Sequence, residues 1–147
     1  MKKIYIILTV LVVAIVIGVM VGLRMYNKEN PNTRDLKANV KVEIPQMAAD
    51  FKADTAKARK KYDNKTISMH GTIEKIEKDH YGHTYFWFSA NDVKIQCLMQ
   101  SDDSVNVAAV HEKQEVKIKG QYKGFMQGDD PVDPQAQLQF SDCIIEK

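Results

Sequence analysis

The chain has 147 residues, with 21 basic and 19 acidic side chains, and its length fits one small domain. Lys2 and Lys3 account for the whole positive excess, so the rest of the chain is electrically balanced. This balance excludes a polyanion binder that relies on bulk charge. The ordinary apolar content excludes an intrinsically disordered chain, and a single long apolar run excludes a protein with many membrane spans.

The first element in chain order is an uncharged run from Ile4 to Leu23, in which all but three residues are apolar. As a helix it would be about 30 Å long, which is the thickness of a bilayer core. We therefore predict a transmembrane signal anchor over residues 4–23, with residues 1–3 as a cytoplasmic tip. Lys2 and Lys3 favour a cytoplasmic N-terminus. The expectation is a single-pass protein of the inner or cytoplasmic membrane with an extracytoplasmic C-terminal domain; a cleaved signal peptide is the alternative.

Residues 24–45 are polar and interrupted by prolines, which predicts a tether whose end could run as an extended edge segment. A helical pattern follows over residues 46–62, because Met47, Phe51, Ala58 and Tyr62 fall near one face.

The remaining chain alternates with the period of two that is typical of strands. A first strand runs from Ile67 and contains Gly71, and the next apolar residue after Ile73 is Ile76, one position out of phase, which predicts a bent strand with a bulge. Four further strands are expected over residues 84–89, 93–99, 116–123 and 138–145, and a short helix over residues 101–110.

This order of elements predicts a mainly β protein with a five-stranded OB-fold barrel over residues 46–147. One N-terminal helix would precede the barrel, and one short helix would lie between the third and fourth strands. An open α+β sheet is the alternative architecture.

Residues from Phe51 to the end carry a resemblance to a known family. The matching positions are Phe51, Asp54, Ala58, Tyr62 and Lys65 in the first helix region, Gly71 and Ile73, then Val93, Ile95 and Cys97, residues 116–120, 124–126 and 142–145, and Asn32-Thr33-Arg34-Asp35 in the tether. The chain resembles the bacterial tRNA-anticodon-like OB-fold domain family, small OB domains behind a lipoprotein signal or a membrane anchor. The resemblance implies the OB-fold, and it does not imply tRNA binding, because fold alone does not define function.

The run Tyr85-Phe86-Trp87-Phe88 is the strongest indication of a binding surface. In a strand its members alternate between two faces, so only one pair can line a small barrel. OB-folds bind ligands on the face of their second and third strands, where aromatic rings stack on bases or sugars. Tyr85 and Trp87 are therefore candidate ligand-binding residues; the alternative is that the N-terminal helix covers the outward pair.

Lys117, Lys119 and Lys123 form a basic stripe on the predicted fourth strand. A surface that follows a phosphate backbone would use such a row, which makes Lys117 and Lys119 further ligand-binding candidates. The alternative is a solvated strand face, which the balanced charge of the domain favours.

Two patterns raise the question of a metal. His80 and His83 share a predicted turn, but no third ligand lies nearby in the sequence. Asp129, Asp130 and Asp133 crowd one loop without the spacing of a calcium-binding loop. We predict no metal and no cofactor, with His80 and His83 as the alternative. No nucleophile–base pair or phosphate-binding glycine loop is present, so we predict that the protein is not an enzyme.

Cys97 and Cys143 are the only cysteines. They fall on the predicted third and fifth strands, which are neighbours in an OB barrel. Cys97 shares the parity of Val93 and Ile95, whereas Cys143 would need a bulge near residues 141–142 to point inward. The two should be close; a disulfide and two buried thiols that pack as small apolar groups both remain open.

The main function hypothesis is a membrane-tethered, extracytoplasmic OB-fold module that binds an unidentified protein or small ligand, with the membrane contacted through residues 4–23. The first alternative is a binder of nucleic acid or another anionic polymer, which the charge balance makes the less favoured partner class. The second is a metal or haem carrier.

Overall fold

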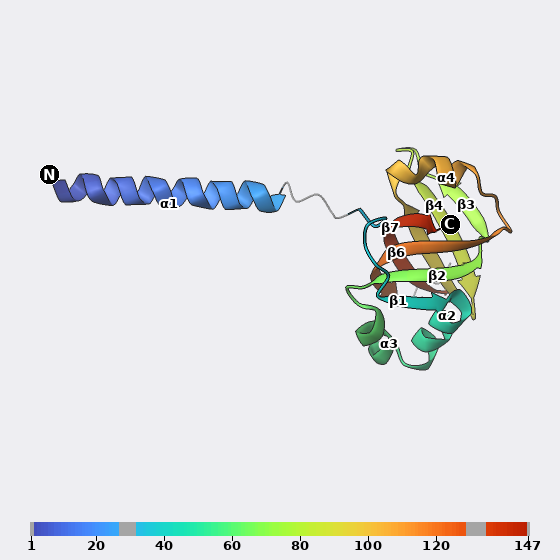
Figure 1. The fold of residues 1–147 in the computed structure, drawn as a ribbon. Helices are drawn as coiled ribbons and strands as arrows, with labels where there is room; N and C mark the ends of the chain where they lie inside the picture. Colours follow the sequence, from blue (N-terminus) through green and yellow to red (C-terminus); the bar gives the residue numbers. More distant parts are fainter. Residues whose placement is uncertain (1, 27–31, 129–134, 147) are drawn as a thin grey trace. The chain divides into compact units, whose positions relative to one another are not determined.

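The computed structural model describes residues 2–26, 32–128 and 135–146. These residues divide into two compact units, one that ends at residue 31 and one that begins at Asn32 (Figure 1). The acidic residues Asp129, Asp130 and Asp133 of the predicted loop lie outside the described residues.

The first unit is helix α1 (Lys2–Tyr26), which includes the apolar run of the sequence. The run is therefore helical, as expected. Among the residues that the structure describes, however, no helix meets the length and hydropathy that a membrane crossing requires. The predicted transmembrane segment over residues 4–23 is thus not supported.

The second unit is built on one sheet of seven strands in the order β1-β2-β6-β7-β5-β4-β3. Two neighbouring pairs, β1–β2 and β5–β7, are parallel, and the other pairs are antiparallel. The strands are β1 (Val40–Glu43), β2 (Thr66–Thr72), β3 (Lys75–Lys78), β4 (Thr84–Ala90), β5 (Val93–Met99), β6 (Glu115–Met126) and β7 (Ala136–Glu146).

The prediction of a five-stranded barrel is wrong, because the sheet is open and has seven strands. Two local features explain the difference. The bent first strand divides at Ile73 and Glu74 into β2 and β3, which pair with different neighbours. The extended end of the predicted tether joins the sheet as β1, parallel to β2. Since four strands separate β2 from β3 in the sheet order but only two residues separate them in the chain, the sheet is strongly curved.

The helix predicted over residues 46–62 is two helices, α2 (Ile44–Ala53) and α3 (Thr55–Tyr62). Asp54 divides them, with an extended backbone at φ −157° and ψ 95°. Its carboxylate accepts a hydrogen bond from the Lys57 amide at 3.0 Å, so it is the N-cap of α3. The short helical segment η1 (Ser101–Asp103) and α4 (Ser104–Ala108) lies between β5 and β6, where the sequence predicts a short helix. Figure 1 shows α2 and α3 at one end of the sheet and α4 at the other.

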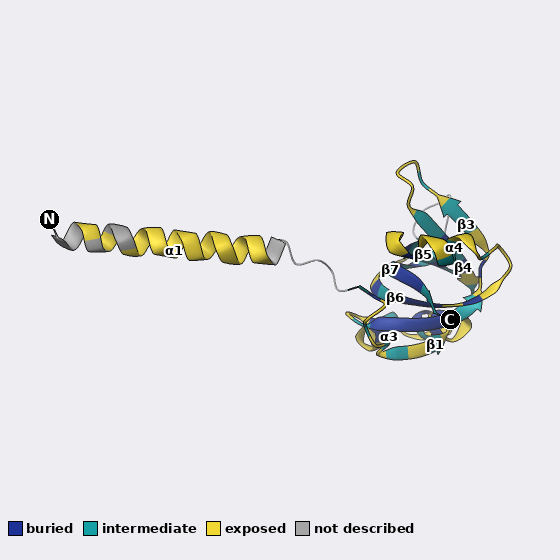
Figure 2. Ribbon diagram, turned by 45° about the horizontal axis from the view of Figure 1, so that its top comes forward, coloured by how far each residue is buried: buried dark blue, intermediate teal, exposed yellow. Residues whose placement is uncertain are grey.

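Helices α2 and α3 are joined by a polar contact above an aromatic core. The Tyr62 hydroxyl and the Lys61 ammonium each donate to the Asp50 carboxylate, both at 2.6 Å. The hydrogen bonds from Lys61 and then Tyr62 lower the pKa of Asp50 to about 2. The Phe51 ring stacks between those of Tyr62 and Phe125, at centroid distances of 5.6 and 5.2 Å. The helices thereby cover this end of the core, and Figure 2 shows much of the sheet coloured as buried or intermediate.

Part of the predicted tether is integral to the second unit. The Arg34 guanidinium donates to the Asp103 carboxylate at 3.0 Å, and the Asp103 side chain is fully buried. The same carboxylate accepts hydrogen bonds from the Asn106 amide at 2.6 Å and from the backbone amide of Ile145 at 2.8 Å. Asp103 therefore connects the start of the unit, the helical segment and the last strand.

This connection generates a prediction for stability. Replacing Asp103 with alanine (D103A) removes three hydrogen bonds and leaves the Ile145 amide without its acceptor. We expect a loss of about 2–4 kcal/mol in the free energy of unfolding, measured by urea titration. The neighbouring Asp102 is exposed and accepts one hydrogen bond from Asn32, so D102A should change the value by less than about 0.5 kcal/mol. Similar losses in the two variants would contradict this role of Asp103.

Candidate functional site

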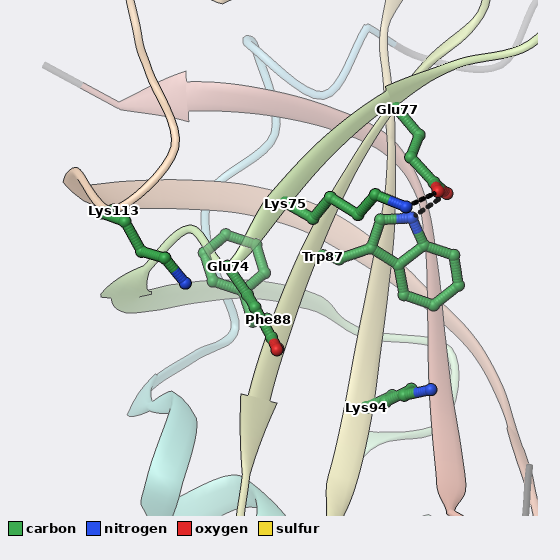
Figure 3. Close-up of a pocket in the computed structure, with 7 residues that line it drawn as sticks. All are labelled: Glu74, Lys75, Glu77, Trp87, Phe88, Lys94 and Lys113. Atoms are coloured by element: carbon green, nitrogen blue, oxygen red, sulfur yellow. Dashed lines mark hydrogen bonds and ion pairs between the residues drawn. The ribbon is translucent and has the colours of Figure 1, made fainter.

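A pocket of about 500 Å³ opens over β3, β4 and the start of β5 (Figure 3). It combines two aromatic side chains with five charged side chains. We call it the Trp87 pocket; its lining residues are Glu74, Lys75, Glu77, Trp87, Phe88, Lys94 and Lys113.

The strand β4 places its aromatic residues on two faces. Phe86 and Phe88 are buried in the core at 0% and 1% exposure, whereas Tyr85 and Trp87 are half-buried on the opposite face. Tyr85 and Trp87 are therefore the outward pair, as the alternation of side chains in a strand requires. The Trp87 indole is thus available to the pocket.

The register of the strands surrounds Trp87 with polar partners. Lys75 of β3 lies directly opposite Trp87 on one side, and Gln96 of β5 lies opposite on the other. Lys94 lies two residues before Gln96 in β5 and therefore on the same face of the strand. The pocket therefore has an aromatic centre with lysines on both sides.

Glu77 fixes the orientation of the indole. Its carboxylate accepts a hydrogen bond from the Trp87 Nε1 at 2.7 Å and a second one from the Lys75 ammonium (Figure 3). The hydrogen bond from Lys75 lowers the pKa of Glu77, and the hydrogen bond to Glu77 raises the pKa of Lys75. Both groups are thus charged at neutral pH, and Glu77 is the ion-pair partner of Lys75 in the pocket.

The bend between β2 and β3 positions the end of the pocket that Lys113 lines. The Ile73 amide donates to the Gln114 carbonyl at 2.9 Å, and the Lys113 amide donates to the Ile73 carbonyl at 2.8 Å. Lys113 adopts a left-handed backbone with φ of 66°, a conformation that is unfavourable for a residue with a side chain. The pair of hydrogen bonds holds this conformation and keeps Lys113 at the pocket.

The remaining predicted ligand residues are not brought to this pocket. Tyr85 shares the face of Trp87 but does not line the pocket. Lys117 and Lys119 lie on β6, which β7 and β5 separate from β4. Lys117 forms an ion pair with Glu146 at 3.4 Å. Lys119 is 8% exposed and donates to the carbonyls of residues 34 and 36 at 3.1 and 2.9 Å, so its role is to hold the start of the unit.

The two histidines of the predicted turn have separate partners. His83 Nδ1 is 2.8 Å from the Asp79 carboxylate, and the His80 ring packs on Tyr81 at a centroid distance of 4.0 Å. Within the part of the chain that the structure describes, no group of three His, Cys, Asp or Glu side chains could hold a metal ion. The alternative hypothesis of a metal at His80 and His83 therefore has no third ligand among the described residues.

The two cysteines are buried, and both are free thiols. Cys97 lies on β5 and Cys143 on β7, and these two strands are neighbours in the sheet. Burial raises the pKa of the Cys143 thiol well above its usual value, and the adjacent Cys97 raises it further.

Sequence reasoning missed Lys75, Glu77 and Lys94 as pocket residues. One signal could have found the first two. The phase slip at Ile76 turns that residue toward the core and therefore turns Lys75 and Glu77 to the outer face, beside the outward members of the aromatic run. Their meeting with Trp87 depends on the register of β3 and β4, which the pattern alone does not define.

The comparison with protein families supports the resemblance that the sequence shows. The tRNA_anti-like family profile matches residues 1–133. The chain belongs to the tRNA_anti-like family. No curated protein matches the chain at a significant level.

This tRNA_anti-like protein also aligns with solved structures. A lipoprotein from Klebsiella pneumoniae, provisionally described as nucleic acid-binding, aligns with a TM-score of 0.53 and 22% identity over 73% of this chain and 91% of its own. A provisionally assigned aspartyl-tRNA synthetase from Leishmania major aligns with a TM-score of 0.46 and 8% identity, over 75% of this chain and 21% of its own. Asparaginyl-tRNA synthetase from Entamoeba histolytica aligns with a TM-score of 0.40 and 13% identity, over 56% and 21%. At 22% identity, the likeness to the Klebsiella lipoprotein concerns the fold alone.

The two faces of β4 predict opposite outcomes for neighbouring substitutions. Truncating the buried Phe86 to alanine (F86A) should cost about 3–5 kcal/mol in the free energy of unfolding, because it leaves a cavity in the core. Truncating Trp87 (W87A) should cost less than about 2 kcal/mol, since it removes one hydrogen bond and partly exposed ring contacts. Urea unfolding of the two variants measures both values. Equal, large losses would show that Trp87 belongs to the core and that the pocket is not a free surface.

Proposed function

We propose that the protein is a binding module whose ligand occupies the Trp87 pocket. The ligand class is an anionic molecule that carries a planar ring, with a short single-stranded nucleic acid as the best example. The observation that supports this class is the outward indole of Trp87 between Lys75, Lys94 and Lys113. A binding role, rather than catalysis, agrees with the family and with the description of the Klebsiella lipoprotein.

The chemistry of each part of the pocket fits this ligand. A flat ring can stack on the half-buried indole, an interaction worth about 1–3 kcal/mol per base in single-strand binding. The anionic group would be placed against the ammonium groups of Lys75 and Lys113. Glu77 already accepts from Lys75, so the ligand anion competes with Glu77 for that partner. This competition favours weak, salt-dependent binding over tight binding.

A nucleic acid ligand is supported by the provisional description of the Klebsiella lipoprotein, which shares the fold over most of its length. The electrically balanced chain argues for a short contact of one or a few nucleotides at the pocket, rather than a long track of phosphates.

The intrinsic fluorescence of the protein locates binding directly, because Trp87 is the only tryptophan. Titration of the full chain with a short oligothymidylate should quench this fluorescence, and added salt should weaken the effect. A labelled oligonucleotide, followed by anisotropy, allows variants to be compared. We expect K113A to bind about three- to tenfold more weakly, and E77Q to bind more tightly because the competing negative charge is lost.

The matched control is K117A, since Lys117 is an exposed lysine on the distant strand β6. It should bind as the unchanged protein does. Polyphosphate, which has no rings, should compete poorly. Unchanged Trp87 fluorescence at saturating oligonucleotide, or equal loss of binding in K117A and K113A, would overturn the assignment of the ligand to this pocket.

We also propose that the folded unit from Asn32 onward works outside the cytoplasm. The support is the N-terminal pair Lys2 and Lys3 before an uncharged apolar run, which is typical of exported chains, and the lipoprotein description of the Klebsiella neighbour. A reporter enzyme that is active only after export, joined to the C-terminus, should be active. Activity only of a reporter that requires the cytoplasm would contradict this location.

A further inference from the structure

The two cysteines meet through a backbone irregularity. Along β5, Cys97 lies opposite Phe140 and Met99 lies opposite Cys143, so two steps on β5 correspond to three steps on β7. The additional residue is accommodated near Asp142, whose φ is 52°. In a regular strand, Phe140 and Cys143 would point to opposite faces. Because of the bulge, both are buried, and Cys143 faces the core on the strand beside that of the buried Cys97, close enough for Cys97 to raise the pKa of its thiol.

The strand on the other side leaves the Cys143 sulfur little space. A Cβ atom built on Gly120 of β6 would lie 2.5 Å from the Cys143 Sγ, closer than real side-chain contacts allow. Glycine at this position therefore lets β6 pass directly against the sulfur. β6 thus limits the space of the Cys143 thiol on one side, and β5, which carries Cys97, is the neighbouring strand on the other.

The backbone around the pair is also fixed. The Gln100 amide donates to the Cys143 carbonyl at 2.8 Å, and the Cys143 thiol donates weakly to the Ser141 carbonyl at 3.7 Å. The left-handed Asp142 and the side-chain-free position 120 are both costly for a strand. Together they allow Cys143 to be buried on the strand beside that of Cys97.

We propose that Cys97 and Cys143 form a disulfide bond that joins β5 to β7 in the working protein. The oxidant is a disulfide of low molecular mass or of a dithiol oxidase. One cysteine thiolate attacks this disulfide and releases one reduced thiol; the second cysteine then displaces the other thiol from the mixed disulfide. Two cysteine S–H bonds and one oxidant S–S bond are lost, and one protein S–S bond and two oxidant S–H bonds form.

The burial of both thiols limits when the disulfide can form. Both thiols have 0% exposure, so the exchange takes place before β5 and β7 have packed, or during a local opening. Once formed, the bond is protected from reductants by the same packing. This inference is independent of the ligand of the Trp87 pocket.

The test uses the full chain, refolded from denaturant with a mixture of oxidised and reduced glutathione. The protein is then unfolded and treated with iodoacetamide. We expect no alkyl group on either cysteine and a chain mass lower by two hydrogens. The urea midpoint should fall when the oxidised protein is unfolded with reductant present, because the bond restricts the unfolded chain.

The controls are the single variants C97A and C143A, in which reductant should leave the urea midpoint unchanged. If either variant fails to fold, the comparison of the unchanged protein with and without reductant still decides the question. Two alkyl groups per chain after the oxidising refold, or glutathione attached to each cysteine, would overturn the proposal.

Discussion

The hydrogen bonds of two consecutive backbone amides determine the course of the sheet in the second unit. The amide of Ile73 donates to the Gln114 carbonyl, and the amide of Glu74 donates to the Trp87 carbonyl. The bend at these two residues is thereby bonded on one side to the residue before β6 and on the other side to β4. The chain passes directly from β2 to β3, although four strands separate them in the sheet order. The curvature of the sheet, the outward turn of the residues after the bend and the position of Lys113 all depend on this division.

One carboxylate organises the pocket that follows from the bend. Glu77 accepts hydrogen bonds from both the Trp87 indole N–H and the Lys75 ammonium. In the proposed binding mode, the ligand anion replaces Glu77 as the partner of Lys75, so we expect the negative charge at position 77 to weaken binding. Trp87 is less sensitive to this exchange, because stacking uses its face and the hydrogen bond uses its edge.

Features that depend on local alternation could be predicted from the sequence, and features that depend on distant partners could not. The period of two correctly locates the strand with Cys97, and the phase argument correctly requires a bulge before Cys143. The division of the long helix at Asp54 was missed because its apolar spacing continues through the break. The number of strands was wrong because β2 and β3 differ only in their neighbours. Lys119 looked like a surface lysine because the carbonyls that it binds lie more than eighty residues away in the chain.

The hold of Lys119 on the segment at residues 34–36 has a mechanical consequence. Any tension that arrives from the N-terminal side meets this ammonium, together with the Arg34–Asp103 pair, before it reaches the edge strand β1. The load therefore passes into β6, which is paired on both sides, and into the carboxylate bound to β7. An edge strand is peeled away easily when it is pulled from its end, and here the interior of the sheet takes that force first.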